Sequence, residues 1–242
     1  MNDLVISGDL QDLLAAEAKK EVSGEKTSDR VYLTCRGKRW RAGDEKLPAE
    51  IDVVVLIAGY EKTYYDSAYD PEKTSPPACF ALSLTEDLVP HDVAPNKQST
   101  SCASCAMNKF ETAAVGKGKA CKDSRRMVMV SYGADGMDTT QVAQFKLPPT
   151  SLKNWASYAK KIGLQYNRPT FAVVTTMSFD DKFDYPVVEF KNKKLIEDPE
   201  EIRRAIGLRE AAVSVVLQPY NVEDYVAPTE NDKSSSNKSK MS

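Results

Sequence analysis

Residues 51–58 read IDVVVLIA, and this nearly continuous apolar run is the strongest structural signal in the sequence. A short run rich in valine and isoleucine is typical of a strand that is buried on both faces or lies at the centre of a sheet. Shorter segments with the residue preferences of strands flank it on both sides. We expect strands at residues 30–35, 51–58, 79–84, 125–132, 141–147, 169–179 and 185–190. The stretch at residues 59–77, which contains four tyrosines, is expected to be a polar loop.

Three segments have helical rather than strand periodicity. Residues 8–20 place leucines on one face of a short amphipathic helix. A second helix is predicted over about residues 151–161, with a threonine or a serine as its N-cap. The third begins at Pro199, where the two glutamates that follow suit the positive end of the helix dipole, and extends to about residue 216.

Short strands with one helix placed late in their order predict a mainly β protein of the α+β class. The arrangement that fits best is a small β-barrel like the five-stranded OB-fold, enlarged by a zinc-binding insertion at residues 79–124 and with helices at both ends; other α+β sheets stay open. We expect residues 1–28 to form a helix and a loop, residues 29–220 the OB-like domain, and residues 221–242 a disordered polar tail.

The composition, with 41% hydrophobic and 28% charged residues among 242, is close to that of globular proteins. The sequence has no apolar run of the roughly 20 residues that a membrane span needs, and it starts without the features of a secretory signal. We therefore expect a cytoplasmic protein, where five cysteines do not indicate a disulfide framework. Cys35 lies within a strand pattern and is expected to be a buried apolar residue.

The other four cysteines have a spacing typical of a metal site. Cys102 and Cys105 form a C-x2-C pair, Cys121 follows after fifteen residues, and Cys79 precedes the pair by twenty-two. A two-residue gap lets both thiolates of a tight turn reach one tetrahedral ion, so we expect these four cysteines to hold a structural zinc ion. His91, the only histidine, is the alternative to Cys79 as fourth ligand, and an iron–sulfur cluster is the alternative to zinc.

No pattern in the sequence predicts a catalytic centre, and we expect the protein not to be an enzyme. A triad would depend on the single histidine, and four soft ligands would close the coordination sphere of zinc. Residues 116–119 read GKGK but lack the spacing of a phosphate-binding loop. A nuclease that holds magnesium on Asp66, Asp70 or the acids of residues 180–184 is the less favoured alternative.

The net charge of −2 conceals a polarised distribution. Residues 36–41 contain four basic and no acidic residues, and residues 97–126 contain seven basic against two acidic ones. Proteins that bind single strands combine a cationic groove with aromatic faces, on each of which a base stacks with about 1–3 kcal/mol. The alternative for Trp40 is that it fills the core. The residues expected to contact nucleic acid are Arg36, Lys38, Arg39, Trp40, Arg41, Tyr60, Tyr64, Tyr65, Tyr69, Lys117 and Lys119.

Five motifs carry a resemblance: YY at 64–65, YDP at 69–71, PPACFA at 76–81, CASC at 102–105 and GKACK at 118–122. Over about residues 30–130 the chain resembles a group of bacteriophage proteins that are often encoded among replication and recombination genes. The resemblance implies a non-enzymatic single-stranded-DNA-binding protein that supports phage DNA replication or recombination, in the host cytoplasm, with replication or recombination proteins as further partners. A zinc-bearing OB-fold is also how the single-stranded-DNA-binding protein of T-even phages looks, although its ligand spacing differs.

The chain departs from that pattern at its end. Many such proteins have an acidic tail that recruits partners, whereas residues 228–242 hold two acids and three lysines. Recruitment by that route is therefore in doubt. A zinc-stabilised interaction module that binds a polymerase or another replication enzyme is the alternative function.

Overall fold

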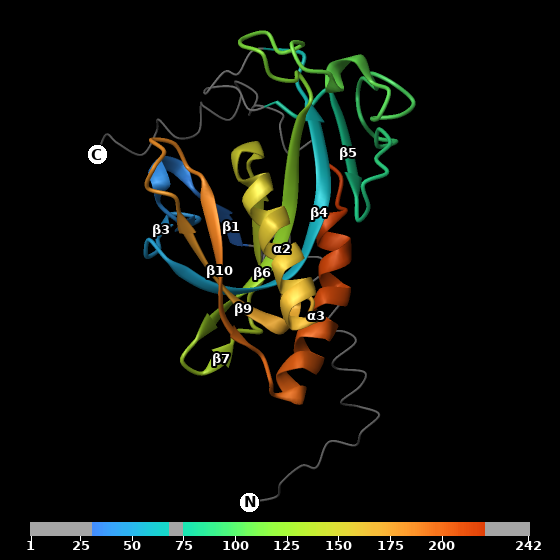
Figure 1. Cartoon of the computed structure of the whole chain (residues 1–242). Helices are drawn as coiled ribbons and strands as arrows, with labels where there is room; N and C mark the ends of the chain where they lie inside the picture. Colours follow the sequence, from blue (N-terminus) through green and yellow to red (C-terminus); the bar gives the residue numbers. More distant parts are fainter. Residues whose placement is uncertain (1–30, 68–74, 221–242) are drawn as a thin grey trace, which may run out of the picture. The chain divides into compact units, whose positions relative to one another are not determined.

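The computed structural model describes residues 31–67 and 75–220, so the helix predicted at residues 8–20 and the tail at 221–242 lie outside the described residues (Figure 1). The strands are β1 (Val31–Thr34), β2 (Arg41–Ala42), β3 (Glu45–Lys46), β4 (Ile51–Tyr64), β5 (Cys79–Ser83), β6 (Lys122–Gly133), β7 (Gly136–Met137), β8 (Ala143–Leu147), β9 (Val173–Phe179) and β10 (Val188–Leu195). The α-helices are α2 (Leu152–Tyr166) and α3 (Pro199–Val216), and single 3-10 turns lie at Arg36–Lys38, Ala106–Asn108, Pro149–Ser151 and Thr170–Ala172.

The strands form one curled sheet in the order β10-β9-β4-β6-β8-β1-β2-β3, with β5 added to β4 and β7 to β6 (Figure 1). The neighbouring pairs are antiparallel except for β1 and β8, which run parallel. The two longest strands, β4 and β6, lie at the centre and pair from Val53 to Thr63. The prediction of a mainly β protein with a helix between late strands and another after them is confirmed.

Strand β4 is longer than the sequence indicates. Residues 59–64, predicted to begin a tyrosine-rich loop, continue the strand because β5 pairs with one edge and β6 with the other. Burial alternates here: Glu61 and Thr63 are buried, whereas Tyr60, Lys62 and Tyr64 are half-buried. The loop prediction is therefore wrong for this part. Backbone pairing on both edges maintains the strand where the apolar run has ended.

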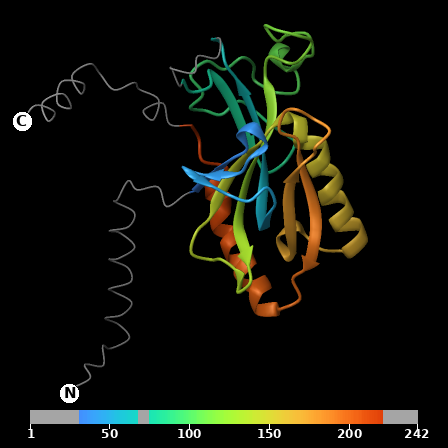
Figure 2. The ribbon, with the colours of Figure 1, turned by 90° about the vertical axis from the view of Figure 1, so that its left-hand side faces the viewer.

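Each face of the sheet has its own apolar core and its own helix (Figure 2). On one face α2 places Trp155, Tyr158 and Ile162 in a cluster with the inward residues of β4, β6 and β9. On the other face α3 contributes Ala205 and Val216 to a second cluster. Burial on both faces explains why residues 51–58 are continuously apolar instead of alternating.

Helix α3 packs closely on β4 because residue 59 is glycine. A Cβ atom at Gly59 would lie 2.2 Å from Cγ1 of the buried Val216. At the other end of α3, Asp198 accepts a hydrogen bond from the backbone N–H of Glu200 at 2.9 Å. This hydrogen bond caps the start of α3, and Pro199 occupies the first helical position. Both features agree with the helix start that the sequence predicts.

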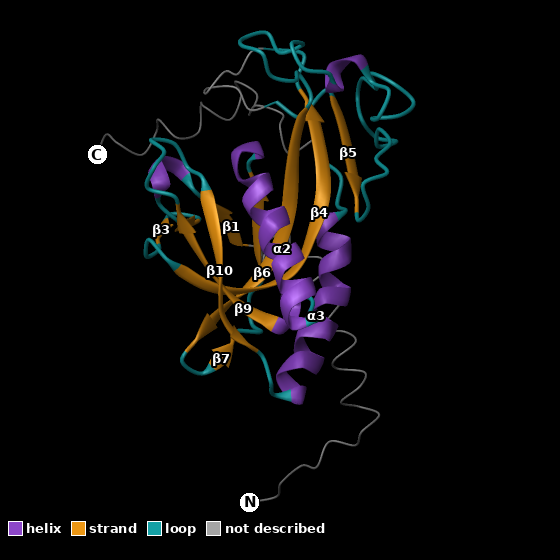
Figure 3. Ribbon diagram, in the orientation of Figure 1, coloured by secondary structure: helices purple, strands orange, loops and turns teal. Residues whose placement is uncertain are grey.

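Residues 84–121, here called the cysteine segment, connect β5 to β6 with a single 3-10 turn as regular structure (Figure 3). Its buried apolar cluster is small, with Leu88 and Cys102 packed against Ala81 and the half-buried Tyr60. The described part of the chain contains no helix that is long and apolar enough to cross a membrane.

Candidate metal centre and nucleic-acid surface

Four cysteines line one small cavity at the end of the sheet where β5 begins and β6 follows. Cys79 is the first residue of β5, Cys121 directly precedes β6, and Cys102 and Cys105 belong to the cysteine segment. All four are buried. The cavity has a volume of about 10 Å³, close to the smallest that holds one water molecule. The fold therefore brings the four predicted ligands together around a space of atomic size.

Backbone hydrogen bonds position the loop that carries the C-x2-C pair. The N–H of Cys102 donates to the carbonyl of Leu88 at 3.2 Å, and the N–H of Asn108 donates to the carbonyl of Cys105 at 3.1 Å. The side-chain amide of Asn108 donates to the carbonyl of Cys102 at 2.8 Å. The N–H of Cys121 donates to the carbonyl of Met107 at 2.8 Å, which attaches Cys121 to the same loop.

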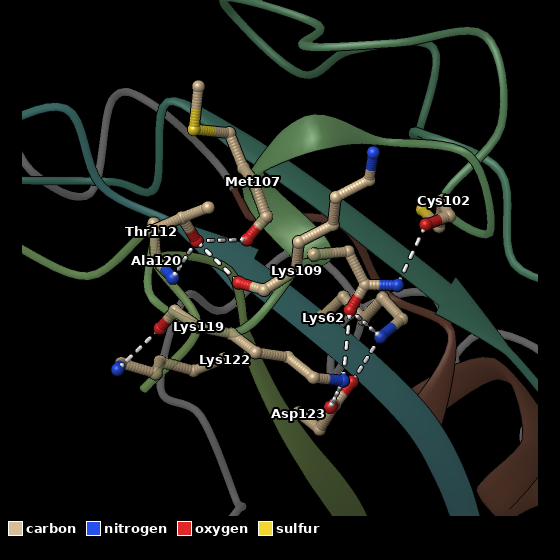
Figure 4. Close-up of polar contacts among 10 residues, drawn as sticks. Lys62, Cys102, Met107, Lys109, Thr112, Lys119, Ala120, Lys122 and Asp123 are labelled. Atoms are coloured by element: carbon tan, nitrogen blue, oxygen red, sulfur yellow. Dashed lines mark hydrogen bonds and ion pairs between the residues drawn. The ribbon is translucent and has the colours of Figure 1, made fainter. Parts of the chain in front are cut away.

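A charged network lies beside the cavity (Figure 4). Lys62, on β4, donates to Asn108 at 2.9 Å and forms a short ion pair with Asp123. Lys119 contacts the same two residues, at 3.2 Å and 3.0 Å. Lys119 is thus engaged within the chain, although the sequence predicted it for nucleic acid.

Burial changes the pKa of two of the cavity thiols. It raises the pKa of Cys102 to about 11 and that of Cys121 to about 12, and the positive charge of Lys62 only partly opposes the increase. Within residues 31–67 and 75–220, no three His, Cys, Asp or Glu side chains stand in positions that already suit a metal ion. None of the five cysteines forms a disulfide bond. The donor set of four buried sulfur atoms around one small cavity fits a soft or borderline metal ion.

His91 does not line this cavity. Its ring stacks on Phe80, with centroids 5.1 Å apart and planes at 21°, and its Nδ1 accepts from the N–H of Val93 at 3.3 Å. Of the two residues predicted as alternatives for the fourth ligand, Cys79 lines the cavity and His91 does not. Cys35 packs half-buried against the core that contains Trp155, as expected for an apolar residue.

Trp40 has no exposed surface. Its ring stacks on Phe179 with centroids 4.5 Å apart and meets Phe145 edge-on at 5.3 Å. The prediction that Trp40 stacks on a base is therefore wrong, because the aromatic cluster of the core occupies the ring. The alternative that the sequence left open, a tryptophan that fills the core, is the observed one.

The basic residues around Trp40 have mixed environments. Arg36 and Arg39 are exposed, whereas Arg41 is half-buried in β2. Lys38 forms an ion pair with Asp181 at 3.2 Å. Two arginines of this group are therefore exposed to solvent.

The tyrosines predicted to contact nucleic acid also differ in their environments. The guanidinium of Arg125 lies 3.0 Å from the ring centroid of Tyr60, so one face of this ring is covered. Tyr64 lines the cysteine cavity, and Tyr65 is exposed. Tyr69 lies outside the described residues. Lys117 is exposed in the cysteine segment.

Strands β6 and β8 lie between β1 and β4 in the sheet. The basic residues 36–41 and the tyrosines of β4 are thus not neighbours in it. The predicted contact residues form no continuous surface by strand pairing.

A buried polar network on the α3 face was not predicted from the sequence. Glu61 has a fully buried side chain and accepts from Arg126 at 2.8 Å, Ser124 at 2.7 Å and Tyr220 at 2.6 Å, with Lys146 at 3.0 Å. Burial alone would raise the pKa of Glu61, but the charges of Lys146 and Arg126 and the hydrogen bonds outweigh it and lower the pKa to about 2. The neighbouring residues carry no signal for it, because the sequence predicts a loop at residues 59–64.

Arg126 connects this network to the helix above it. Its Nη1 donates to the carbonyl of Val216 at 3.3 Å and, at a shorter distance, to that of Gln218. A cation at the C-terminal end of a helix is favourable, because carbonyl groups there lack partners and carry partial negative charge. The network therefore fixes the end of α3 on the sheet.

Comparisons with protein families, with curated proteins and with solved structures find no match for this chain. The resemblance to bacteriophage proteins stays a prediction.

Proposed function

We propose that the chain is a non-enzymatic, zinc-stabilised protein that binds single-stranded DNA, with the curled sheet as an OB-like barrel. The observation that carries the metal part is the convergence of four buried cysteines on one cavity. The nucleic-acid part is supported by exposed cationic and aromatic side chains on the same domain. These are Arg36, Arg39, Tyr65 and Lys117.

Zinc would be held by Cys79, Cys102, Cys105 and Cys121. Four sulfur ligands complete a tetrahedral sphere, so the ion would link segments of the chain and leave no position for a reacting water. A cavity with room for about one atom favours a single ion over a multi-iron cluster. The positive charge of Lys62 would offset part of the negative charge of four thiolates around a divalent ion.

The test of DNA binding is a fluorescence titration with single-stranded oligonucleotides of mixed sequence, at several salt concentrations and beside the duplex. We expect binding that prefers single strands and weakens with salt, with a logarithmic slope of about −0.7 for each phosphate neutralised. Absence of binding to single strands at low salt would contradict the proposal.

Elemental analysis of the same preparation tests the metal. We expect about one zinc ion per chain, following the four-sulfur stoichiometry of structural sites. Cys102→Ser should lose it, whereas Cys35→Ser, which changes the cysteine outside the cavity, should retain it. Equal metal content in both variants would contradict the assignment.

A second candidate function is supported by exposed apolar side chains in the cysteine segment. Phe110 is 73% exposed and Val115 is 91% exposed, and both lie between Cys105 and Cys121. Apolar side chains on a loop held in place are suited to a protein partner such as a polymerase. A purified replication enzyme that binds the wild type but not Phe110→Ser, in the absence of nucleic acid, would favour this function.

A further inference from the structure

A groove lies on the α3 face of the sheet beyond the C-terminal end of that helix. Its volume is about 520 Å³, within the range of about 300–1,000 Å³ of small-ligand sites. Strands β1, β4, β6 and β8 and the residues after α3 form its walls. The side chains that matter are Tyr32, Thr34, Arg126, Gln144, Lys146 and Tyr220.

Strand alternation explains why polar side chains gather here. Leu33, Phe145 and Leu147 point into the core under α2, so the residues between and beside them point to the opposite face. Tyr32 is paired with Gln144 across the parallel β1–β8 contact. Within residues 31–67 and 75–220, α3 packs on β4 and β6 and does not cover β1 and β8.

The groove offers both an aromatic and a cationic contact. Tyr32 is 54% exposed, and the side chain of Lys146 is 45% exposed. The single carboxylate of the buried Glu61 pairs with both Arg126 and Lys146, and Lys146 also donates to the hydroxyl of Tyr220 at 3.1 Å. Two cations against one anion leave the groove positive, and the buried Glu61–Arg126 pair keeps its floor fixed.

The geometry points to a nucleotide-binding groove in which a base stacks on Tyr32 and a phosphate pairs with Lys146. Gln144 and Thr34 lie beside the ring with groups that can hydrogen-bond to base edges. The occupant is a segment of single-stranded nucleic acid, so the inference rests on the proposed function and gives it a site. None of these residues belongs to the set predicted from the sequence.

The test compares single-strand affinity of Tyr32→Ala, Tyr32→Phe and Lys146→Gln with the wild type, in the full chain. Loss of one stacked base at about 1–3 kcal/mol corresponds to binding that is weaker by about fivefold or more for Tyr32→Ala. Tyr32→Phe keeps the ring and should bind like the wild type. Lys146→Gln should reduce the magnitude of the salt slope by about 0.7, the value for one phosphate on a single strand.

Two matched controls change similar residues elsewhere. Tyr185 is 51% exposed between β9 and β10, and Lys160 is exposed on α2, against the opposite face of the sheet. Tyr185→Ala and Lys160→Gln should bind like the wild type. An unchanged thermal unfolding midpoint in each variant shows that it is folded.

The outcomes separate the two proposals. If the wild type binds and the groove variants bind as well as the controls, the groove is not the site, and the proposed function stands. Equal weakening by Tyr32→Phe and Tyr32→Ala would overturn the stacking role. If the wild type itself does not bind single strands at low salt, both proposals fail.

Discussion

The sheet and the cysteine segment differ in the side chains that they bury. The sheet has two apolar clusters, one under each helix, and its central strands are continuously buried over residues 53–57 and 126–130. The cysteine segment has one small cluster around Leu88 and Cys102 and a single 3-10 turn. Burial of apolar surface stabilises at about 25 cal/mol per Å², so the second region gains little from it. The comparison indicates that the cysteine segment needs a different source of order.

The largest effect on the sheet is expected from the buried charge network around Glu61. Glu61→Gln leaves Arg126 buried without its carboxylate, and breaking such a pair costs about 3–5 kcal/mol. Urea unfolding should show this loss, while zinc content stays unchanged because Glu61 lies outside the cysteine cavity. Glu189→Gln, which changes an exposed pair with Lys191, should cost less than about 1 kcal/mol. Equal costs for the two variants would show that the network does not stabilise the sheet.

The same carboxylate predicts a pH dependence. The pKa of Glu61 is lowered to about 2 in the folded chain from an ordinary value of 4.5. The carboxylate therefore stabilises the fold above about pH 4.5, and this contribution is lost as the pH falls from there through 2. Stability measured across this range should decrease less steeply for Glu61→Gln than for the wild type. Parallel curves would contradict the assignment.

Close packing of α3 on β4 provides a smaller effect. Gly59→Ala places a methyl group 2.2 Å from the side chain of Val216 and should cost about 1–3 kcal/mol, as overpacking of a core does. Gly133→Ala has open space around the new atom and is the control. Chemical denaturation compares them. Equal stability of both variants would mean that α3 does not lie this close to the sheet.

The smallest effect concerns the start of α3. Asp198→Ala removes the capping acceptor for the N–H of Glu200 and should cost about 1 kcal/mol. Glu197→Ala changes the exposed neighbour and should have no measurable effect. Because residues 197 and 198 lie outside the cysteine cavity, metal content should be the same in both. A greater loss from Glu197→Ala would contradict the cap.

The sequence predicted those parts of the fold that depend on local pattern. The run at residues 51–58 and the Pro199 helix start are such features, since apolar periodicity and caps are written in neighbouring residues. The cysteine spacing likewise predicted the four residues that share a cavity. Strand pairing was not predictable in this way. Part of the expected loop belongs instead to β4, because it pairs with β5 and β6.

Contacts distant in the sequence explain the other differences. The four basic residues around Trp40 predict an exposed aromatic ring. In the structure its ring is enclosed by Phe145 and Phe179, which are more than 100 residues away in the sequence. Glu61 finds its partners at Arg126 and Tyr220 for the same reason. Neither environment is encoded in the neighbouring residues, so both required the fold.

The measurement that tests the central comparison most directly is amide hydrogen exchange on the zinc-loaded protein before and after chelation. Structural zinc contributes about 10 kcal/mol or more to small metal-dependent folds, so its removal should release the segment that it holds. We predict that amides of residues 88–121 lose protection, whereas those of β4 and β6 at the sheet centre retain it. Unchanged protection in both regions, or equal loss in both, would contradict the account.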